Sequence, residues 1–343
     1  MNNKIYFVCP TNKSISGGIK QIYRQVEVLN KNGFNAVVLL KNHIKEKWFE
    51  SNVPIESNPY LFKKIKYSYK NKSINFWRNL VLKYLRLKSK TFEKDSILVF
   101  PEIYGPRICE IEPEIKKVIF NQNCYYTFEH FKLDENLSKI PYNQNILATI
   151  CVSEDSEKYL KFAFPNLPVY RIHLGIDNKV FKYSAEKKRQ IAFMPRKLSE
   201  DVVQVINILR NRGRLEGWNF VAIDNKTEIE VAKILRESAI FLSFNHKEGF
   251  GLPPVEAMSC GCYVIGYAGE AGKEYLKPEF SSLIPDGNIV KFVEAVEKTI
   301  DIFETNPMVI IDKGKKGSDF ANENYNLKRE DANITSVWKN ILN

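Results

Sequence analysis

The chain has 343 residues, 44% hydrophobic and 27% charged, which is typical of a globular protein with two domains. No apolar run is long enough to span a membrane and the amino terminus lacks a signal-peptide pattern, so we expect a cytoplasmic protein rather than an integral membrane or exported one. The formal net charge of +11 favours anionic partners, which include nucleotide phosphates, acidic lipid surfaces and nucleic acid.

The first half of the sequence alternates predicted strands with helices. The run Ile5–Cys9 predicts a strand, and apolar residues then recur on one helical face over Ile19–Asn30. Ala36–Leu40 predicts the next strand, so the chain opens with a strand–helix–strand unit, which implies a parallel sheet. Further strands are predicted at Ile97–Phe100, Lys117–Asn121, Ile146–Val152 and Val169–Ile172.

Residues 63–90 differ from the rest because they hold many Lys and Arg, several aromatic residues and no Asp or Glu. From Phe76 onward the pattern is helical, and the apolar residues of one face are Trp77, Leu80, Val81, Tyr84 and Leu85. This pattern fits a helix that packs its apolar face against its own domain. It equally fits a basic amphipathic surface that contacts an anionic membrane, so both interpretations stay open.

A second series of strands and helices begins after the interrupted stretch 165–188. Its strands are predicted at Gln190–Met194, Phe220–Ile223, Ile240–Phe244 and Cys262–Gly266. Its helices are predicted at Asp201–Arg212, Thr227–Ser238, Pro254–Ser259, Asn288–Phe303 and Lys328–Leu342. We therefore predict a first domain over 1–165, a second over 170–325, and a final helix within 326–343 that crosses back to the first domain.

The most informative segment is residues 244–258, Phe-Asn-His-Lys-Glu-Gly-Phe-Gly-Leu-Pro-Pro-Val-Glu-Ala-Met, which begins where a predicted strand ends. Backbone N–H groups at a helix start behind flexible glycines bind anions such as phosphate. Glu248 and Glu256 would repel a phosphate, but carboxylates accept hydrogen bonds from sugar and ribose hydroxyls. A simple turn would account for either glutamate alone, whereas the two together suit a sugar linked to a nucleoside diphosphate.

Glu248 and Glu256 match the Glu-x7-Glu motif of the retaining glycosyltransferases of family 4, the glycosyl transferases group 1. The surrounding Glu-Gly-Phe-Gly-Leu-Pro-Pro-Val-Glu-Ala-Met-Ser-Cys-Gly is also similar to that family's signature. The resemblance implies the GT-B fold, with two facing doubly wound α/β (Rossmann-like) domains and a cleft between them. It implies that Glu248 lies by the donor sugar and Glu256 holds the donor ribose, while sugar and phosphate meet the backbone of Gly249, Phe250, Gly251 and Leu252.

Two weaker similarities follow in the expected order. Gly17 and Gly18 resemble the family's amino-terminal glycine loop, where the backbone comes close to the diphosphate. Arg196 and Lys197 follow a predicted strand and resemble its phosphate-clamping pair. The family spaces that Arg and Lys five apart, but residue 201 is Asp here, so an exposed basic turn remains an alternative for Lys197.

The chain departs from the family after the predicted strand Lys117–Asn121, where many relatives have a His near the reacting carbon. Gln122 and Asn123 stand there, and they donate hydrogen bonds but cannot shuttle a proton. A departing diphosphate that accepts the acceptor's proton makes a protein base unnecessary, so catalysis would consist of positioning and leaving-group stabilisation. We therefore expect Glu248, Gln122 and Asn123 to be the catalytic residues.

The resemblance implies sugar transfer, with retained anomeric configuration, from a UDP, GDP or dTDP sugar to a hydroxyl. The donor is expected on the second domain, at the carboxyl ends of its strands, and the acceptor on the first. No Asp-x-Asp motif occurs and the cysteines and histidines lack zinc-site spacing, so we expect neither a metal nor another cofactor. Together with residues 63–90, the family favours surface-polysaccharide assembly, such as O-antigen or capsule on a lipid carrier, at the inner face of the membrane.

Two other functions stay open. A soluble metabolic transferase would make a small glycoside or disaccharide from a free sugar. A nucleic-acid-binding or nucleic-acid-modifying protein would fit the charge of +11, but the two glutamates and the Gly-Phe-Gly loop argue against a purely binding role, and nucleic acid is not the expected partner.

Overall fold

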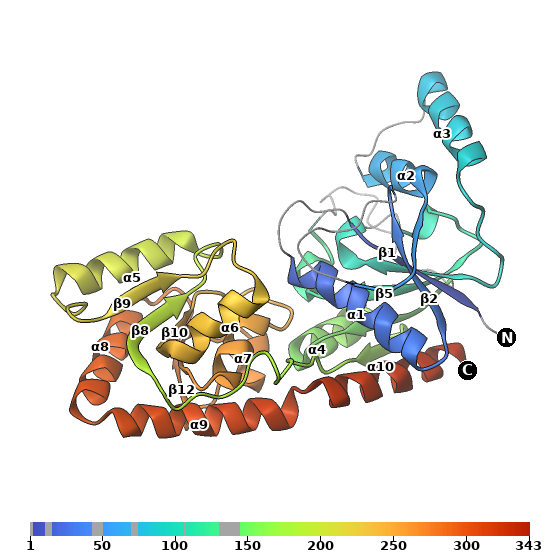
Figure 1. The fold of residues 1–343 in the computed structure, drawn as a ribbon. Helices are drawn as coiled ribbons and strands as arrows, with labels where there is room; N and C mark the ends of the chain where they lie inside the picture. Colours follow the sequence, from blue (N-terminus) through green and yellow to red (C-terminus); the bar gives the residue numbers. More distant parts are fainter. Residues whose placement is uncertain (1–2, 11–15, 43–50, 70–74, 106–107, 130–144) are drawn as a thin grey trace. The chain divides into compact units, whose positions relative to one another are not determined.

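The computed structural model describes residues 3–10, 16–42, 51–69, 75–105, 108–129 and 145–343. They form two compact units, of which the first comprises Met1–Ile172 with Asp331–Asn343 and the second comprises His173–Glu330. Each unit is a parallel sheet with helices packed against it, as the alternation of strands and helices predicts (Figure 1).

The first unit has a seven-stranded parallel sheet in the order β3-β2-β1-β4-β5-β6-β7. Strand order reverses between β1 and β4, because β2 and β3 lie on one side of β1 and the later strands on the other. Ligands of open α/β sheets bind at such a switch point, outside the carboxyl ends of the strands. The strands are β1 (Lys4–Val8), β2 (Asn35–Leu40), β3 (Ile55–Ser57), β4 (Ile97–Pro101), β5 (Lys116–Asn121), β6 (Ile146–Cys151) and β7 (Val169–Arg171).

The second unit has a five-stranded parallel sheet in the order β12-β11-β10-β8-β9. Its strand order reverses between β8 and β10, so the segments after these two strands are the expected place for a ligand. The strands are β8 (Lys188–Phe193), β9 (Asn219–Ala222), β10 (Ser238–Ser243), β11 (Tyr263–Tyr267) and β12 (Ser281–Ile284).

Helices connect the strands in both units. In the first unit they are α1 (Gly17–Lys31), α2 (Pro59–Tyr69), α3 (Phe76–Lys88) and α4 (Glu154–Ala163), with short 3₁₀ turns η1 (Glu102–Tyr104), η2 (Ile108–Glu110) and η3 (Cys124–Tyr126). The later ones are α5 (Ser199–Asn211), α6 (Glu228–Glu237), α7 (Leu252–Ser259), η4 (Ala271–Glu274), α8 (Ile289–Thr305), α9 (Pro307–Asn324) and α10 (Leu327–Leu342). Within the described ranges, no helix combines the length and the apolar character needed to cross a membrane.

Apolar strands build both cores. Strand β10 is buried along its whole length, and β2 is buried from Ala36 to Leu40. Parallel strands covered on both faces have such unbroken apolar runs. In the second unit the ring of Phe244, just after β10, stacks on Phe292 of α8 with 4.5 Å between centroids, so the strand end that carries the candidate site is anchored in the core.

The last helix, α10, packs into the first unit from Asp331 onward. Trp338 is fully buried and its ring lies 5.7 Å from that of Phe7 in β1, centroid to centroid. Asp331 accepts hydrogen bonds from Arg24 and from Lys31 of α1, the latter at 3.0 Å. These contacts connect residues 331–343 to β1 and α1.

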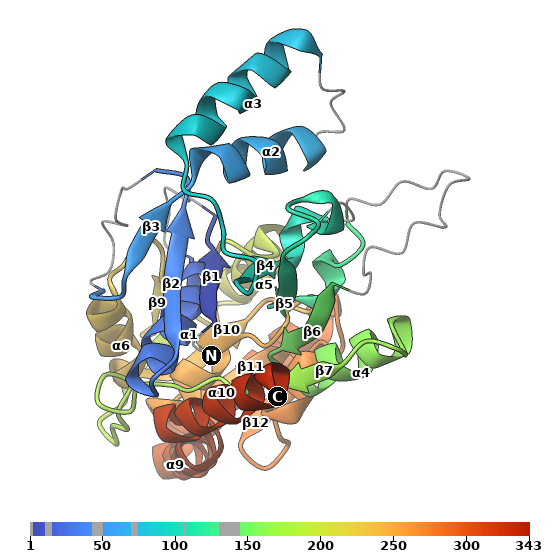
Figure 2. The same ribbon diagram turned by 90° about the vertical axis from the view of Figure 1, so that its right-hand side faces the viewer.

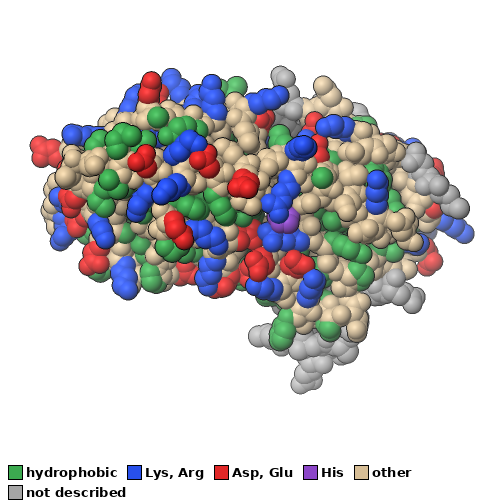
Figure 3. All heavy atoms as spheres, turned by 90° about the horizontal axis from the view of Figure 1, so that it is seen from below, with side chains coloured by type: hydrophobic (Ala, Val, Ile, Leu, Met, Phe, Trp, Pro, Cys, Tyr) green, Lys and Arg blue, Asp and Glu red, His purple; other side chains and the backbone are tan. Residues whose placement is uncertain are grey.

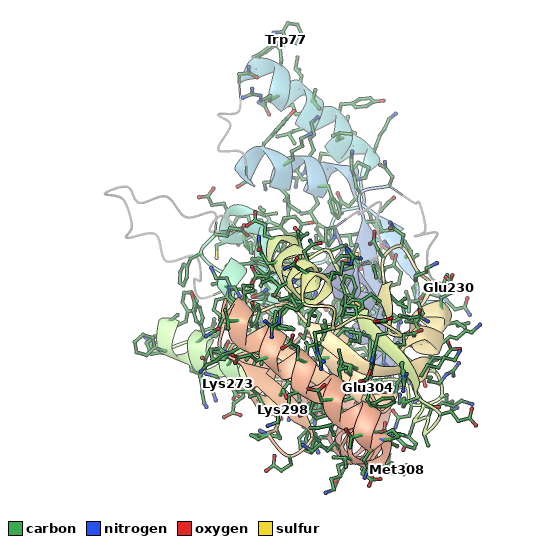
Figure 4. The ribbon with its side chains drawn as sticks, turned by 90° about the vertical axis from the view of Figure 1, so that its left-hand side faces the viewer. Trp77, Glu230, Lys273, Lys298, Glu304 and Met308 are labelled. Carbon is green, nitrogen blue, oxygen red and sulfur yellow. The ribbon has the colours of Figure 1, made fainter. Side chains whose placement is uncertain are left out.

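Helix α3 exposes the apolar face that its sequence predicts. The exposed fractions are 72% for Trp77 and 56% for Tyr84, Leu80 and Val81 are also exposed, and Leu82 is the buried residue of the helix. Helix α3 follows α2 at one end of the first unit (Figure 2), and Trp77 lies at its far end (Figure 4). The interpretation in which α3 packs this face against its own domain is therefore wrong for Trp77, Leu80, Val81 and Tyr84.

Candidate active site

The predicted donor-binding residues of the second unit follow the two strands at its switch point. Arg196 and Lys197 lie in the segment between β8 and α5, and both are exposed. Glu248 and the glycines around Phe250 lie in the segment between β10 and α7. Because β8 and β10 are hydrogen-bonded neighbours, their carboxyl ends bring these segments to one edge of the sheet.

Glu248 is the centre of a small polar cluster. Its Oε1 atom accepts hydrogen bonds from Nζ of Lys197 and from Nδ2 of Asn245. The structure thus brings together Lys197 and Glu248, which are 51 residues apart in the sequence and were predicted to contact different parts of one donor. Asn245 belongs to the same sequence segment but was not expected to contact the carboxylate.

Asp201 occupies the position of the family's phosphate-binding lysine, and its carboxylate accepts a hydrogen bond from a tyrosine of the same unit. The hydroxyl of Tyr267, at the end of β11, donates to the Asp201 carboxylate at 2.8 Å. Burial of Tyr267, followed by the hydrogen bond and the negative charge of Asp201, raises the pKa of that hydroxyl. Asp201 therefore ties the first turn of α5 to β11, and Lys197 is the lysine of this segment that contacts Glu248.

Helix α7 starts at Leu252, two residues earlier than its predicted start at Pro254. Gly251 is its N-cap in a left-handed conformation, with φ 87° and ψ 74°, and no side chain caps the helix. Pro253 and Pro254 have no N–H, so the backbone donors of this helix start are those of Gly251 and Leu252. Both donors belong to the stretch Gly249–Leu252, whose backbone is expected to meet sugar and phosphate, and only the predicted helix start at Pro254 changes.

The Gly-Phe-Gly loop packs against two tyrosines, and the sequence pattern did not predict this contact. The hydroxyl of Tyr275 donates to the backbone carbonyl of Phe250 at 2.8 Å. The buried Phe250 ring lies 5.3 Å from the ring of Tyr275 and 5.2 Å from that of Tyr325, centroid to centroid. Burial raises the pKa of Tyr275 well above its ordinary value, so the hydroxyl stays protonated as a donor at neutral pH. Glu256 lies further along α7 and is half-buried.

The predicted residues of the first unit also meet at one edge of its sheet. Gln122, directly after β5, donates from Nε2 to the backbone carbonyl of Gly18 at 3.1 Å. Gly17 and Gly18 form the first turn of α1 and not the loop that was expected, because glycines add nothing to the apolar periodicity that marks the helix. Asn123 is buried, and its side chain accepts the N–H of Tyr125 at 3.1 Å.

Comparisons with known proteins agree with this architecture. Residues 214–316 match the model of the family described as glycosyl transferases group 1. The chain is similar to an alpha-1,6-glucosyltransferase of Actinobacillus pleuropneumoniae, with 28% identity over 98% of this chain and 95% of that protein.

Solved structures share the fold at low sequence identity. A structure of HepE from Anabaena in complex with UDP and glucose has a TM-score of 0.67 at 13% identity, covering 98% of this chain and all of that one. Sucrose-phosphate synthase from Thermosynechococcus elongatus has a TM-score of 0.67 at 12% identity, covering 99% of each chain. With two Rossmann-like units that match GT-B structures and a glycosyl transferases group 1 domain in the second, the chain is a glycosyltransferase.

Proposed function

We propose that the protein transfers a glucosyl residue from UDP-glucose to a sugar hydroxyl, with retained anomeric configuration. The observation that carries this proposal is the cluster at the switch point of the second unit. There the Glu248 carboxylate, the Lys197 ammonium and a helix start without a side-chain cap follow two neighbouring strands. The cluster offers a cation and backbone donors to a diphosphate, and a carboxylate to sugar hydroxyls.

Donor binding would rearrange the Lys197–Glu248 pair. A diphosphate carries more negative charge than one carboxylate, so Lys197 would move toward the phosphates. Glu248 would then be released to accept hydrogen bonds from the sugar, while Asn245 keeps its carboxylate oriented. Arg196 would add a second cation, and Glu256 would hold the ribose.

The choice of donor and stereochemistry is supported by the similar proteins. The Actinobacillus relative is named for an alpha-1,6 linkage, and the Anabaena structure holds UDP and glucose. UDP-glucose carries its glucose in the α configuration, so an α-linked product implies retention. A 1,6 linkage is made to a primary hydroxyl, so we propose a glycan acceptor with a free C6 hydroxyl, bound by the first unit.

Thermal unfolding with and without UDP, UDP-glucose and GDP tests the donor. A ligand present at about 100 times its Kd stabilises the folded state by about 2.7 kcal/mol, or roughly 5–10 °C for a domain of this size. UDP and UDP-glucose should raise the melting temperature and GDP should do so less. Transfer of labelled glucose to an α-glucoside acceptor then tests catalysis, and no shift with any nucleotide would contradict the proposal.

We propose that transfer needs no divalent metal, since the sequence holds no Asp-x-Asp motif and Lys197 with Arg196 supplies positive charge beside the diphosphate. Turnover should therefore be unchanged by EDTA. Activity that is lost in EDTA and restored by manganese would contradict this part of the proposal.

We further propose that the enzyme works on a surface glycan at an anionic membrane, which α3 contacts. On the face shown in Figure 3 basic and acidic side chains are interspersed, whereas residues 63–90 contain no acidic residue. Helix α3 exposes Phe76, Trp77, Tyr84 and Leu87 among its lysines and arginines. Aromatic rings favour the interfacial region of a bilayer, and basic residues favour anionic headgroups.

Co-sedimentation with phosphatidylcholine vesicles, with and without phosphatidylglycerol, measures this contact. The wild type should bind only the anionic vesicles, and Trp77→Ala should weaken the partition by roughly tenfold or more, since burying such a side chain is worth about 1.5–3 kcal/mol. Phe162→Ala is the matched control, because Phe162 is 92% exposed on α4 of the same unit but lies outside the basic region. No binding to the anionic vesicles would favour the soluble transferase instead, and equal binding to both vesicle types or equal effects of the two variants would contradict a contact made by α3 with anionic lipid.

A further inference from the structure

The carboxylate of Glu102 joins the ends of β4 and β5. Glu102 begins η1 directly after β4 and is only 5% exposed. Its Oε2 accepts the backbone N–H of Gln122 at 3.1 Å, and its Oε1 accepts that of Asn123 at 3.1 Å. Because each oxygen holds one N–H group, the carboxylate fixes the backbone direction of the two residues predicted to act at the reacting sugar.

The connection continues from Gln122 to the first turn of α1. The Gln122 amide donates to the carbonyl of Gly18, and a Cβ atom on Gly18 would come within 3.3 Å of Gln122 Oε1. Strands β1, β4 and β5 are neighbours in the sheet, and the switch point lies between β1 and β4. The Glu102 carboxylate and the Gln122 side chain together therefore connect three chain segments at the place where an open α/β sheet binds its ligand.

We propose that Glu102 is a positioning residue for glycosyl transfer, whose ionised carboxylate holds Gln122 and Asn123 in working geometry without contacting the substrate. This inference rests on the proposed function. A group that aligns others contributes through geometry, and displacement of a reacting group by about 1 Å can lower turnover by roughly 100-fold.

The charge of Glu102 makes this alignment sensitive to pH. Burial raises the pKa of Glu102 to about 7, and the backbone N–H groups of Gln122 and Asn123 act in the opposite direction. Above that pH both oxygens accept N–H groups, whereas below it a proton occupies one of them, so kcat should rise with pH through about 7. The turns and strand packed around η1 carry further titratable groups, none of which contributes to this shift: Tyr104, Lys116, Lys117, Cys124, Tyr125 and Tyr126.

The test compares Glu102→Gln with the full-length wild type. An amide presents an NH₂ group to one of the two backbone N–H groups, so one donor loses its acceptor while the size of the side chain is kept. We expect kcat for UDP-glucose to fall by roughly 10- to 100-fold with a nearly unchanged KM for the donor, because Arg196, Lys197 and Glu256, the side chains proposed to hold the donor, lie on the second unit. Glu114→Gln is the matched control, since Glu114 is an exposed carboxylate of the same unit.

The pH profile separates alignment from a loss of folding. The wild type should lose kcat on the acid side of about pH 7 while the UDP-induced rise in melting temperature persists, and Glu102→Gln should lack this acid limb. A wild-type kcat that stays flat from mildly acidic to mildly alkaline pH would overturn the inference without any variant. A Glu102→Gln enzyme within twofold of the wild type would overturn it as well, whereas a wild type with no transfer at all would reject the proposed function itself.

Discussion

Glu248→Gln is expected to lower kcat for glucosyl transfer by roughly 100-fold or more, as the loss of one preorganised polar group at a reacting centre does in other enzymes. Lys197 and Asn245 both donate to this carboxylate, so its charge is held in place before a sugar arrives. Glutamine keeps the size of the side chain but removes the charge that makes these hydrogen bonds strong. Steady-state kinetics with UDP-glucose should show the loss mainly in kcat rather than in KM.

Glu256→Gln should have the opposite kinetic signature. A carboxylate that holds the ribose contributes to binding before and during reaction, so its loss should weaken UDP affinity by roughly 10- to 100-fold, or about 1.5–3 kcal/mol. Turnover at saturating donor should stay near that of the wild type, and calorimetric titration with UDP measures the affinity. Glu216→Gln, in an exposed turn before β9, is the control that should change neither quantity. Wild-type kcat in Glu248→Gln and wild-type UDP affinity in Glu256→Gln would together reject the roles assigned to these residues.

The strands that carry the candidate site could be predicted because they are continuous apolar runs. Strands β1, β5, β8 and β10 all lie within two residues of their predicted bounds. Strands β3 and β12 were missed, since Ile55–Ser57 has three half-buried residues and Ser281–Ile284 starts with two serines. Edge strands of this kind have too few apolar residues for a pattern to appear.

Helix α9 was missed for a different physical reason. The residues that it buries are mostly small, and small residues do not produce apolar periodicity: Gly314, Gly317, Ser318 and Ala321. A Cβ atom on Gly314 would collide with the backbone carbonyl of Gly261, so the helix packs backbone to backbone at the end of α7. Gly314, a residue type that usually argues against a helix, is needed for this close approach.

Residues of the candidate site could be predicted only where a short sequence segment has an informative pattern by itself. Glu248 and Glu256 share one segment whose order of Gly and Pro is informative by itself. Glu102 contacts Gln122 across 20 residues because β4 and β5 are neighbouring strands, and Tyr275, directly after η4, contacts Phe250 across 25 residues. No sequence pattern marks such contacts between distant residues, so they could be identified only in the folded structure.

Gly251→Ala is the substitution in the loop with the largest expected effect on the fold. Its φ of 87° already strains any residue with a side chain, at about 1–2 kcal/mol. A Cβ atom would also lie 2.6 Å from the hydroxyl oxygen of Tyr275, which donates to Phe250. The ring would have to move and leave a buried carbonyl without its donor, so we expect a total loss of about 2–4 kcal/mol in the free energy of unfolding.

Gly33→Ala is the control that separates the backbone strain of a positive φ from the collision with Tyr275. Gly33 has a similar φ of 83°, but no atom would lie within 4 Å of an added Cβ, so this variant should lose only about 1–2 kcal/mol and keep its response to UDP. Gly251→Ala should lose the UDP-induced rise in melting temperature, because the backbone donors of Gly251 and Leu252 shift with the loop. Adding Tyr275→Phe removes the colliding oxygen, so the double variant should be more stable than the sum of the two single changes predicts. Strictly additive losses, or equal losses for Gly251→Ala and Gly33→Ala, would mean that Tyr275 does not hold this loop against the donor.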